Sequence, residues 1–179
     1  IPVVFIDNYS RGNYANFSYI NSDDEAGGYL AAKHLTAKGY KKIALCAVEL
    51  AGPLMQKRYE GYKRAMKEAG CKEYVFDKLG TPFEAGLQFA DLLSAQQMDA
   101  AFCTEDMVAV GLLHGMLRKG VRVGKEFGLV GFDNIHSGRQ VFPELTTIDQ
   151  NIFEKGETAT KTLLKILSKK NSLGSRLIL

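Results

Sequence analysis

Short apolar runs and segments of helical periodicity alternate along almost the whole chain. The short runs match buried strands, and the segments between them carry apolar residues at spacings of three and four, as helices packed on a sheet do. This alternation predicts an α/β fold with parallel sheets and helices on both faces. The expected strands span residues 2–7, 18–21, 42–47, 73–77, 100–103, 128–132, 146–149 and 176–179.

Five helices are expected between these strands, over about residues 22–39, 57–69, 83–95, 107–118 and 152–167. Arg58 is expected in the first turn of the second helix, which Gly70 ends. The last helix carries an apolar stripe at Ile152, Gly156, Ala159, Leu163 and Ile166 or Leu167.

The fourth expected helix is unusual because it has apolar residues on all sides. They are Met107, Val108, Val110, Leu112, Leu113, Met116 and Leu117. Such a helix must be covered by its own sheet and by something else. Gly111 and Gly115 would permit a close approach of that second cover.

Composition and charge limit the possible partners. The chain has 179 residues, of which 46% are hydrophobic, and its net charge of +3 comes from scattered Lys and Arg, so DNA contact must lie elsewhere. Three cysteines without metal-ligand spacing suit buried, reduced thiols in a cytosol. No apolar run approaches the roughly 20 residues that cross a bilayer. Because Ile1 opens directly in a strand-like run, we treat the chain as a fragment.

The sequence lacks several common catalytic and cofactor motifs. The segment from Gly120 to Lys125 is one residue too short for a phosphate loop, and the glycines of 128–131 lie inside a strand rather than opening a helix. The three histidines lack metal-ligand spacing, and no serine stands in a nucleophile elbow. We therefore expect no enzyme activity, no metal and no cofactor.

One strand points to a ligand. Residues 127–134 read F-G-L-V-G-F-D-N, an apolar run that stops at Asp133 and an amide. Open α/β sheets place their binding groups at the carboxyl ends of parallel strands, so Asp133 is the first candidate for a ligand contact. The alternative interpretation of Asp133 is a helix cap.

Several segments, in this order, resemble the effector domain of the lactose-repressor/galactose-repressor (LacI/GalR) transcription factors. They are I-P-V-V-F-I-D (1–7), D-D-E-A-G-G-Y-L-A-A-K-H-L (23–35), K-K-I-A-L (41–45), R-Y-E-G-Y (58–62), D-A-A-F-C-T-E-D-M-V-A-V-G (99–111), G-L-V-G-F-D-N (128–134) and L-T-T-I-D-Q (145–150). The resemblance implies a type I periplasmic-binding-protein-like fold, in which two Rossmann-like lobes clamp a small ligand. This chain would hold one nearly complete lobe and part of another.

The resemblance also implies domain boundaries. Residues 1–17 would end the first lobe and cross over, 18–150 would form the second lobe, 151–172 would return to the first lobe, and 173–179 would add the last strand of the second. Most of the first lobe and the DNA-binding headpiece would be absent.

Site residues follow from the family positions. Asp133 would accept hydrogen bonds from the hydroxyls of a polyol and Arg58 would donate them, the alternative for Arg58 being a surface ion pair. Glu105 stands where the family often has Asn, which suggests a different ligand, such as one bearing an amine, and Asp106 suits a helix cap or hinge contact. Three further residues match family positions at the cleft, namely Asp7, Gln150 and Ile152, and strand-end turn chemistry and core packing explain them equally well. The last candidates are the aromatic residues Phe83 and Tyr9.

The expected function is effector binding and dimerisation in a cytoplasmic LacI-type transcriptional repressor. The effector would be a sugar or sugar derivative, and operator DNA would be bound through the missing headpiece. The expected homodimer interface is the fourth helix, through Val110, Leu113, His114 and Leu117. The alternatives are a solute-binding protein of a sugar transporter and a doubly wound enzyme.

Overall fold

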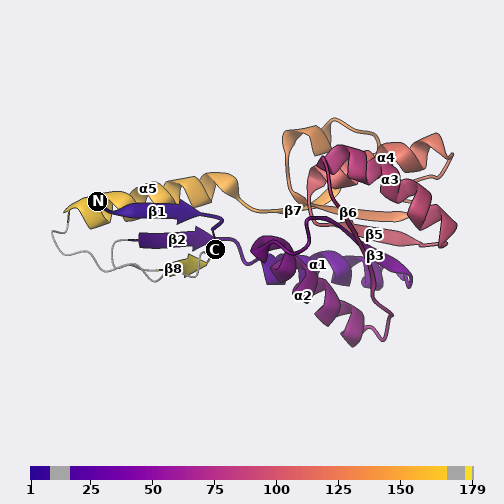
Figure 1. The fold of residues 1–179 in the computed structure, drawn as a ribbon, viewed down its shortest axis with the longest axis horizontal. Coiled ribbons are helices and arrows are strands. Elements are labelled where there is room, and N and C mark those ends of the chain that lie inside the picture. The colour runs from indigo at the N-terminus through magenta and orange to yellow at the C-terminus, as the bar shows by residue number, and fades with distance from the viewer. Residues whose placement is uncertain (9–16, 169–175, 179) are drawn as a thin grey trace. The chain divides into compact units, whose positions relative to one another are not determined.

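The chain forms two compact units in a computed structural model that describes residues 1–8, 17–168 and 176–178. The first unit combines Ile1–Asp24 with Gln150–Leu179, and the second unit is Glu25–Asp149. Each unit has its own parallel sheet (Figure 1). The predicted α/β class is therefore confirmed.

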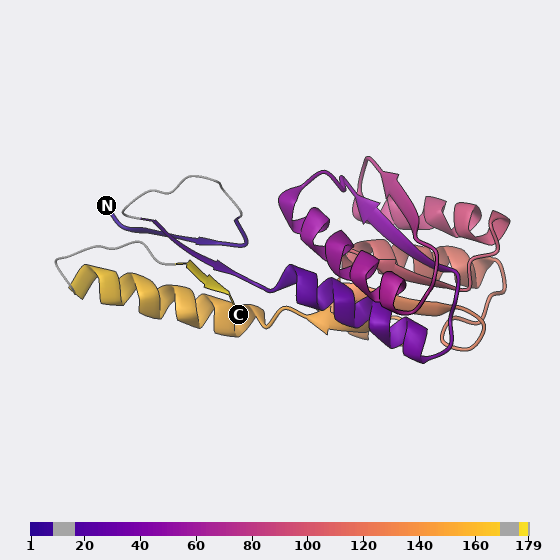
Figure 2. The same cartoon turned by 90° about the horizontal axis from the view of Figure 1, so that it is seen from below.

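The second unit is built on a five-stranded parallel sheet with the strand order β4-β3-β5-β6-β7. Its strands are β3 (Ile43–Val48), β4 (Tyr74–Lys78), β5 (Ala100–Cys103), β6 (Gly128–Asp133) and β7 (Thr146–Asp149). Its helices are α1 (Asp24–Ala37), α2 (Pro53–Glu68), α3 (Pro82–Ala95) and α4 (Asp106–Arg118). Helices α1 and α2 lie on one face of the sheet, and α3 and α4 lie on the other (Figures 1 and 2).

Alternation along the central strands divides the core between these two faces. In β5, Ala101 and Cys103 pack toward α3 and α4, whereas Ala100 and Phe102 pack toward α1 and α2. Both faces are buried, which explains why these strands read as continuous apolar runs. Cys46 of β3 is the register partner of Cys103, and both thiols are free and buried, as expected, whereas the free thiol of Cys71 is only partly buried.

The first unit holds a three-stranded parallel sheet, β1 (Val3–Ile6), β2 (Phe17–Asn21) and β8 (Arg176–Ile178), which packs against α5 (Ile152–Ser168). This pairing corrects the domain boundary expected at residue 17 and the assignment of 173–179 to the second lobe. The physical reason is that a strand's local pattern shows it to be buried but does not show which strand it pairs with. Leu179, expected in the last strand, lies outside the described residues.

Helix α2 begins four residues earlier than its periodicity predicts. Gly52 is its N-cap and Pro53 occupies its first turn, where a proline's missing N–H is not needed. Arg58 is therefore in the second turn of α2 and not in the first. The 3-10 helix η1 (His136–Arg139) was also not expected in the loop after β6.

The second cover of α4 is α3 of the same unit. A Cβ on Gly111 would lie 2.1 Å from the carbonyl oxygen of Phe83, and one on Gly115 would lie 2.4 Å from Cβ of Ala90. These glycines thus allow two helices of one chain to approach closely, which corrects their expected place at a subunit interface. Val110 and Leu113, expected at that interface, are buried in the core, and His114 and Leu117 remain exposed.

Candidate functional site

Asp133 ends β6 at the carboxyl edge of the five-stranded sheet, with 26% of its side chain exposed. Its φ of 117° and the φ of 57° at Asn134 are conformations that non-glycine residues seldom adopt. Such backbone strain is concentrated at binding and active sites. The N-cap of the following 3-10 helix is Ile135, so the alternative of a helix cap for Asp133 is not what the structure shows.

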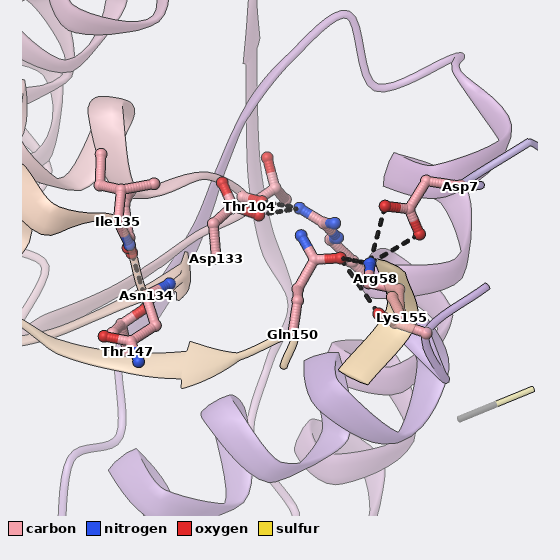
Figure 3. Close-up of polar contacts among 11 residues, drawn as sticks. Asp7, Arg58, Thr104, Asp133, Asn134, Ile135, Thr147, Gln150 and Lys155 are labelled. Atoms are coloured by element: carbon pink, nitrogen blue, oxygen red, sulfur yellow. Dashed lines mark hydrogen bonds and ion pairs between the residues drawn. The ribbon is translucent and has the colours of Figure 1, made fainter. Parts of the chain in front are cut away.

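Three kinds of contact hold Arg58 beside Asp133, and Figure 3 shows the polar ones. Its Nη1 donates to the carbonyl oxygen of Thr104 and lies 3.4 Å from Oδ1 of Asp133, and its Cζ lies 3.7 Å from the ring centroid of Phe132. Only 3% of Arg58 is exposed, which excludes the alternative of a surface ion pair. The 3.4 Å contact is longer than the roughly 2.7–2.9 Å of a strong charge-assisted hydrogen bond. The guanidinium is thus fixed by its surroundings more than by Asp133.

Glu105 precedes α4 at its N-cap position, but its side chain does not cap the helix. Burial is the main cause that raises its pKa, the charge of Asp133 adds to this, and Arg58 opposes it. Glu105 after β5, Asp133 at the end of the neighbouring β6 and Arg58 of α2 therefore interact electrostatically.

Asp106 is a structural residue of this edge. It is fully buried, its Oδ2 accepts from the backbone N–H of Ile135 at 2.9 Å, and its Oδ1 accepts from the hydroxyl of Thr147 at 2.6 Å. A Cβ on Gly131 would lie 2.2 Å from Oδ1 of Asp106, which explains the glycine of the G-F-D-N segment. The contacts join the start of α4 to the segment after β6 and to β7.

Burial raises the pKa of Asp106 from 3.8 to about 6, although its hydrogen bonds oppose the shift. The carboxyl group of Asp106 therefore binds its proton more tightly in the folded protein than in the unfolded chain. The resulting stability is fully present below about pH 4 and is lost as the pH rises through about 6, a change of about 3 kcal/mol. We expect the free energy of unfolding of the unaltered protein, relative to that of Asp106→Asn, to fall by up to this amount between pH 4 and 7.5. Urea unfolding at four pH values measures it, and a constant difference would contradict the prediction.

In the first unit, Asp7 and Gln150 converge on Lys155 (Figure 3). Nζ of Lys155 lies 2.8 and 2.7 Å from the two carboxylate oxygens of Asp7 and 2.7 Å from Oε1 of Gln150, which also accepts from the hydroxyl of Ser22 at 3.1 Å. Sequence reasoning missed Lys155. The available signal was its spacing of four from Ala159, which places it on the inward stripe of α5, where a lysine is out of pattern.

Two further candidates, Ile152 and Phe83, lie in neither of these two groups. Ile152 is 62% exposed, so the inward stripe of α5 begins at Lys155 instead. The ring of Phe83 packs edge-on against His114 at 5.6 Å between centroids, in the contact of α3 with α4. Tyr9 lies outside the described residues.

Residues 1–8, 17–168 and 176–178 contain no cluster of metal ligands and no membrane-spanning helix. In this part of the chain, His, Cys, Asp and Glu side chains form no group of three or more that could hold a metal ion. None of the helices described there has the length and apolar character needed to cross a membrane.

Comparison with known proteins agrees with the geometry. Residues 32–178 match the model of the periplasmic binding protein-like domain. The HTH-type transcriptional repressor PurR of Haemophilus influenzae (strain PittEE) is 34% identical over 175 residues, which cover 96% of this chain and 51% of that protein. A LacI family transcriptional regulator from Enterococcus faecium, solved with bound ribose, shows 28% identity and a TM-score of 0.88, over 99% of this chain and 66% of that one. The transcription regulator CcpA of Lactococcus lactis shows 29% identity and a TM-score of 0.88, with the same coverage.

The paired parallel α/β units define a periplasmic-binding-protein-like fold of type I, as expected. The chain belongs to the periplasmic binding protein-like family and, within it, is an effector-binding domain of the LacI/GalR type. It spans about half the length of the curated relatives it matches.

Proposed function

We propose that this chain binds a neutral sugar or sugar derivative as the effector of a transcriptional repressor. The observation that carries the proposal is the buried guanidinium of Arg58, fixed 3.4 Å from the partly exposed carboxylate of Asp133. A polyol presents hydroxyls that both donate and accept, and such a donor and acceptor side by side match two adjacent hydroxyls. Asp7 and Gln150 are proposed as further ligand groups in the first unit.

The relatives support a regulator over the alternatives. PurR is by name a repressor, and the E. faecium regulator was solved with ribose. A solute-binding protein of a transporter would share the fold, but these relatives are regulators. A binding protein is also favoured over an enzyme, because in the described residues Arg58, Glu105 and Asp133 form no nucleophile–base pair.

Dimerisation is proposed through the outer surface of α3 and α4. His114 and Leu117 are exposed there, beside a groove of about 300 Å³ lined by Leu87, Gln88, Ala90, Asp91, Gly115, Arg118 and Lys119. Leu117 would supply the apolar contact of a two-fold interface. The proposed partner of the full-length protein is operator DNA, bound through a headpiece outside this chain. Because a bacterial regulator meets its operator in the cytoplasm, we propose that location as well.

Calorimetry with the full-length protein tests the proposal. The titrants are a panel of neutral monosaccharides that includes D-ribose, together with one amino sugar. We expect at least one neutral sugar to bind and to change the protein's affinity for operator DNA in a gel-shift assay. Preference for the amino sugar would assign Glu105 a direct role in recognising an ammonium group. Failure of every sugar to bind would refute the proposal.

A further inference from the structure

Lys155 is the one fully buried residue of α5 among those described, with 1% of its surface exposed. Removing a lysine ammonium from water is costly unless hydrogen bonds and an opposite charge compensate for it. Its place on the inward stripe would suit an apolar residue, which would pack there without this cost. A lysine at this position therefore calls for a role beyond packing.

The contacts of Lys155 indicate that role. An ammonium group has three N–H donors, and three acceptor oxygens lie within 2.8 Å of it, two from Asp7 and one from Gln150. Asp7 follows β1 with a φ of 51°, and Gln150 follows β7. Lys155 thus ties together the chain segments at Asp7 and Gln150, and the hydroxyl of Ser22 adds a third segment through the same oxygen of Gln150.

The contacts of Lys155 affect in two ways how Asp7 and Gln150 can bind a ligand. The amide group of a glutamine side chain can rotate by half a turn, which exchanges the positions of its oxygen and nitrogen. At Gln150 the hydrogen bond from Lys155 holds the oxygen toward the ammonium group. The carboxylate of Asp7 has 32% of its side chain exposed, so it can still accept a hydrogen bond while its charge is balanced by the ammonium. Balanced charge favours neutral hydroxyl groups over cations at this position.

We propose that Lys155 is a positioning residue: it fixes the Asp7 carboxylate and the Gln150 amide and cancels the charge of Asp7, so that both groups receive a neutral hydroxylated ligand. The inference rests on the proposed function, because Asp7 and Gln150 are ligand groups only under that function. Lys155 itself does not contact the ligand.

The test compares Lys155→Met, which keeps the length of the side chain without its charge, with Lys155→Arg, which keeps the charge. The matched control is Lys161→Met, which removes an exposed lysine of the same helix that pairs with Glu157. Affinity is measured in the full-length protein for D-ribose, or for whichever neutral monosaccharide of the panel binds the unaltered protein most tightly. Lys155→Met should weaken binding roughly tenfold or more, Lys155→Arg should weaken it less, and Lys161→Met should leave it unchanged.

A second readout does not depend on the ligand. The side-chain amide resonances of Gln150, assigned from their absence in Gln150→Leu, should shift in Lys155→Met and stay in place in Lys161→Met. Should Lys155→Met fail to fold, Lys155→Gln, which keeps a polar group without the charge, is measured instead. Lower stability with unchanged affinity and unshifted Gln150 resonances would make Lys155 a structural ion pair and overturn the proposal. If the unaltered protein binds no sugar, the proposed function fails, while the Gln150 resonances still decide whether Lys155 holds that side chain.

Discussion

A Leu113→Glu variant should lose the folded structure of the second unit. Leu113 is 1% exposed and packs in the core among the apolar side chains of the cluster between the sheet and α3. Burying an unpaired charge costs several kcal/mol, a large part of the roughly 5–15 kcal/mol that stabilise a typical domain. Circular dichroism and urea unfolding would measure the loss.

Leu117→Glu is the matched variant, one helical turn further along α4. Leu117 is 42% exposed, so the glutamate stays in water and the fold should be retained. If this surface is the subunit interface, sedimentation should show folded monomers in place of dimers. An unchanged dimer would rule out this surface, and a folded Leu113→Glu protein would show that the core position of Leu113 is misassigned.

The predicted architecture of the second unit was largely correct because both of its signals are local. A buried strand and an amphipathic helix each show their period within a few residues, and the expected bounds of β5 and β7 agree with the structure. The predicted start of α2 is four residues too late because Pro53, which suits the first turn of a helix, gives no apolar periodic signal. The partner of α4 could not be predicted, because apolar residues on every side show that a helix is covered but not by which segment.

The strand-end pattern indicates Asp133 and the family resemblance adds Arg58, and the structure shows why these two residues, 75 positions apart, meet. β3, β5 and β6 are neighbours in a parallel sheet, so the segments that follow them lie at one edge. Arg58, on the helix after β3, reaches the carbonyl oxygen of Thr104 after β5 and the carboxylate at the end of β6. Spacing along the chain does not reveal this meeting, because it depends on strand order.

Lys155 and Asp106 show a different limit. Both are buried charged residues whose role depends on partners far along the chain, Asp7 for Lys155 and Thr147 for Asp106. From the sequence alone, a charged residue is expected at the surface. That this expectation fails for Lys155 and Asp106 is seen only once the fold shows the first on the inward stripe of α5 and the second at the buried start of α4.

Truncating Asp133 to Ala should have the largest effect on ligand binding. Ligand hydroxyls and the guanidinium of Arg58 would lose their acceptor, at a cost of about 2–4 kcal/mol in binding free energy, or roughly thirty- to a thousandfold in affinity. Stability should change much less, because the side chain is 26% exposed and its contact with Arg58 is long. Arg58→Ala is a poorer probe, because it also removes the contacts with Thr104 and Phe132 and should destabilise the core.

Asp77→Ala is the control for Asp133→Ala. Asp77 is an exposed carboxylate near the end of edge strand β4, where it accepts from the backbone N–H of Leu50. Calorimetry of the full-length protein, with the monosaccharide that binds the unaltered protein most tightly, should show near-normal affinity for Asp77→Ala and a large loss for Asp133→Ala. Asp133→Asn should fall between them, because it keeps one acceptor oxygen and loses the charge. If Asp133→Ala binds that sugar as tightly as the unaltered protein does, the site assignment is wrong, and the family fold would stand without a pocket at Arg58.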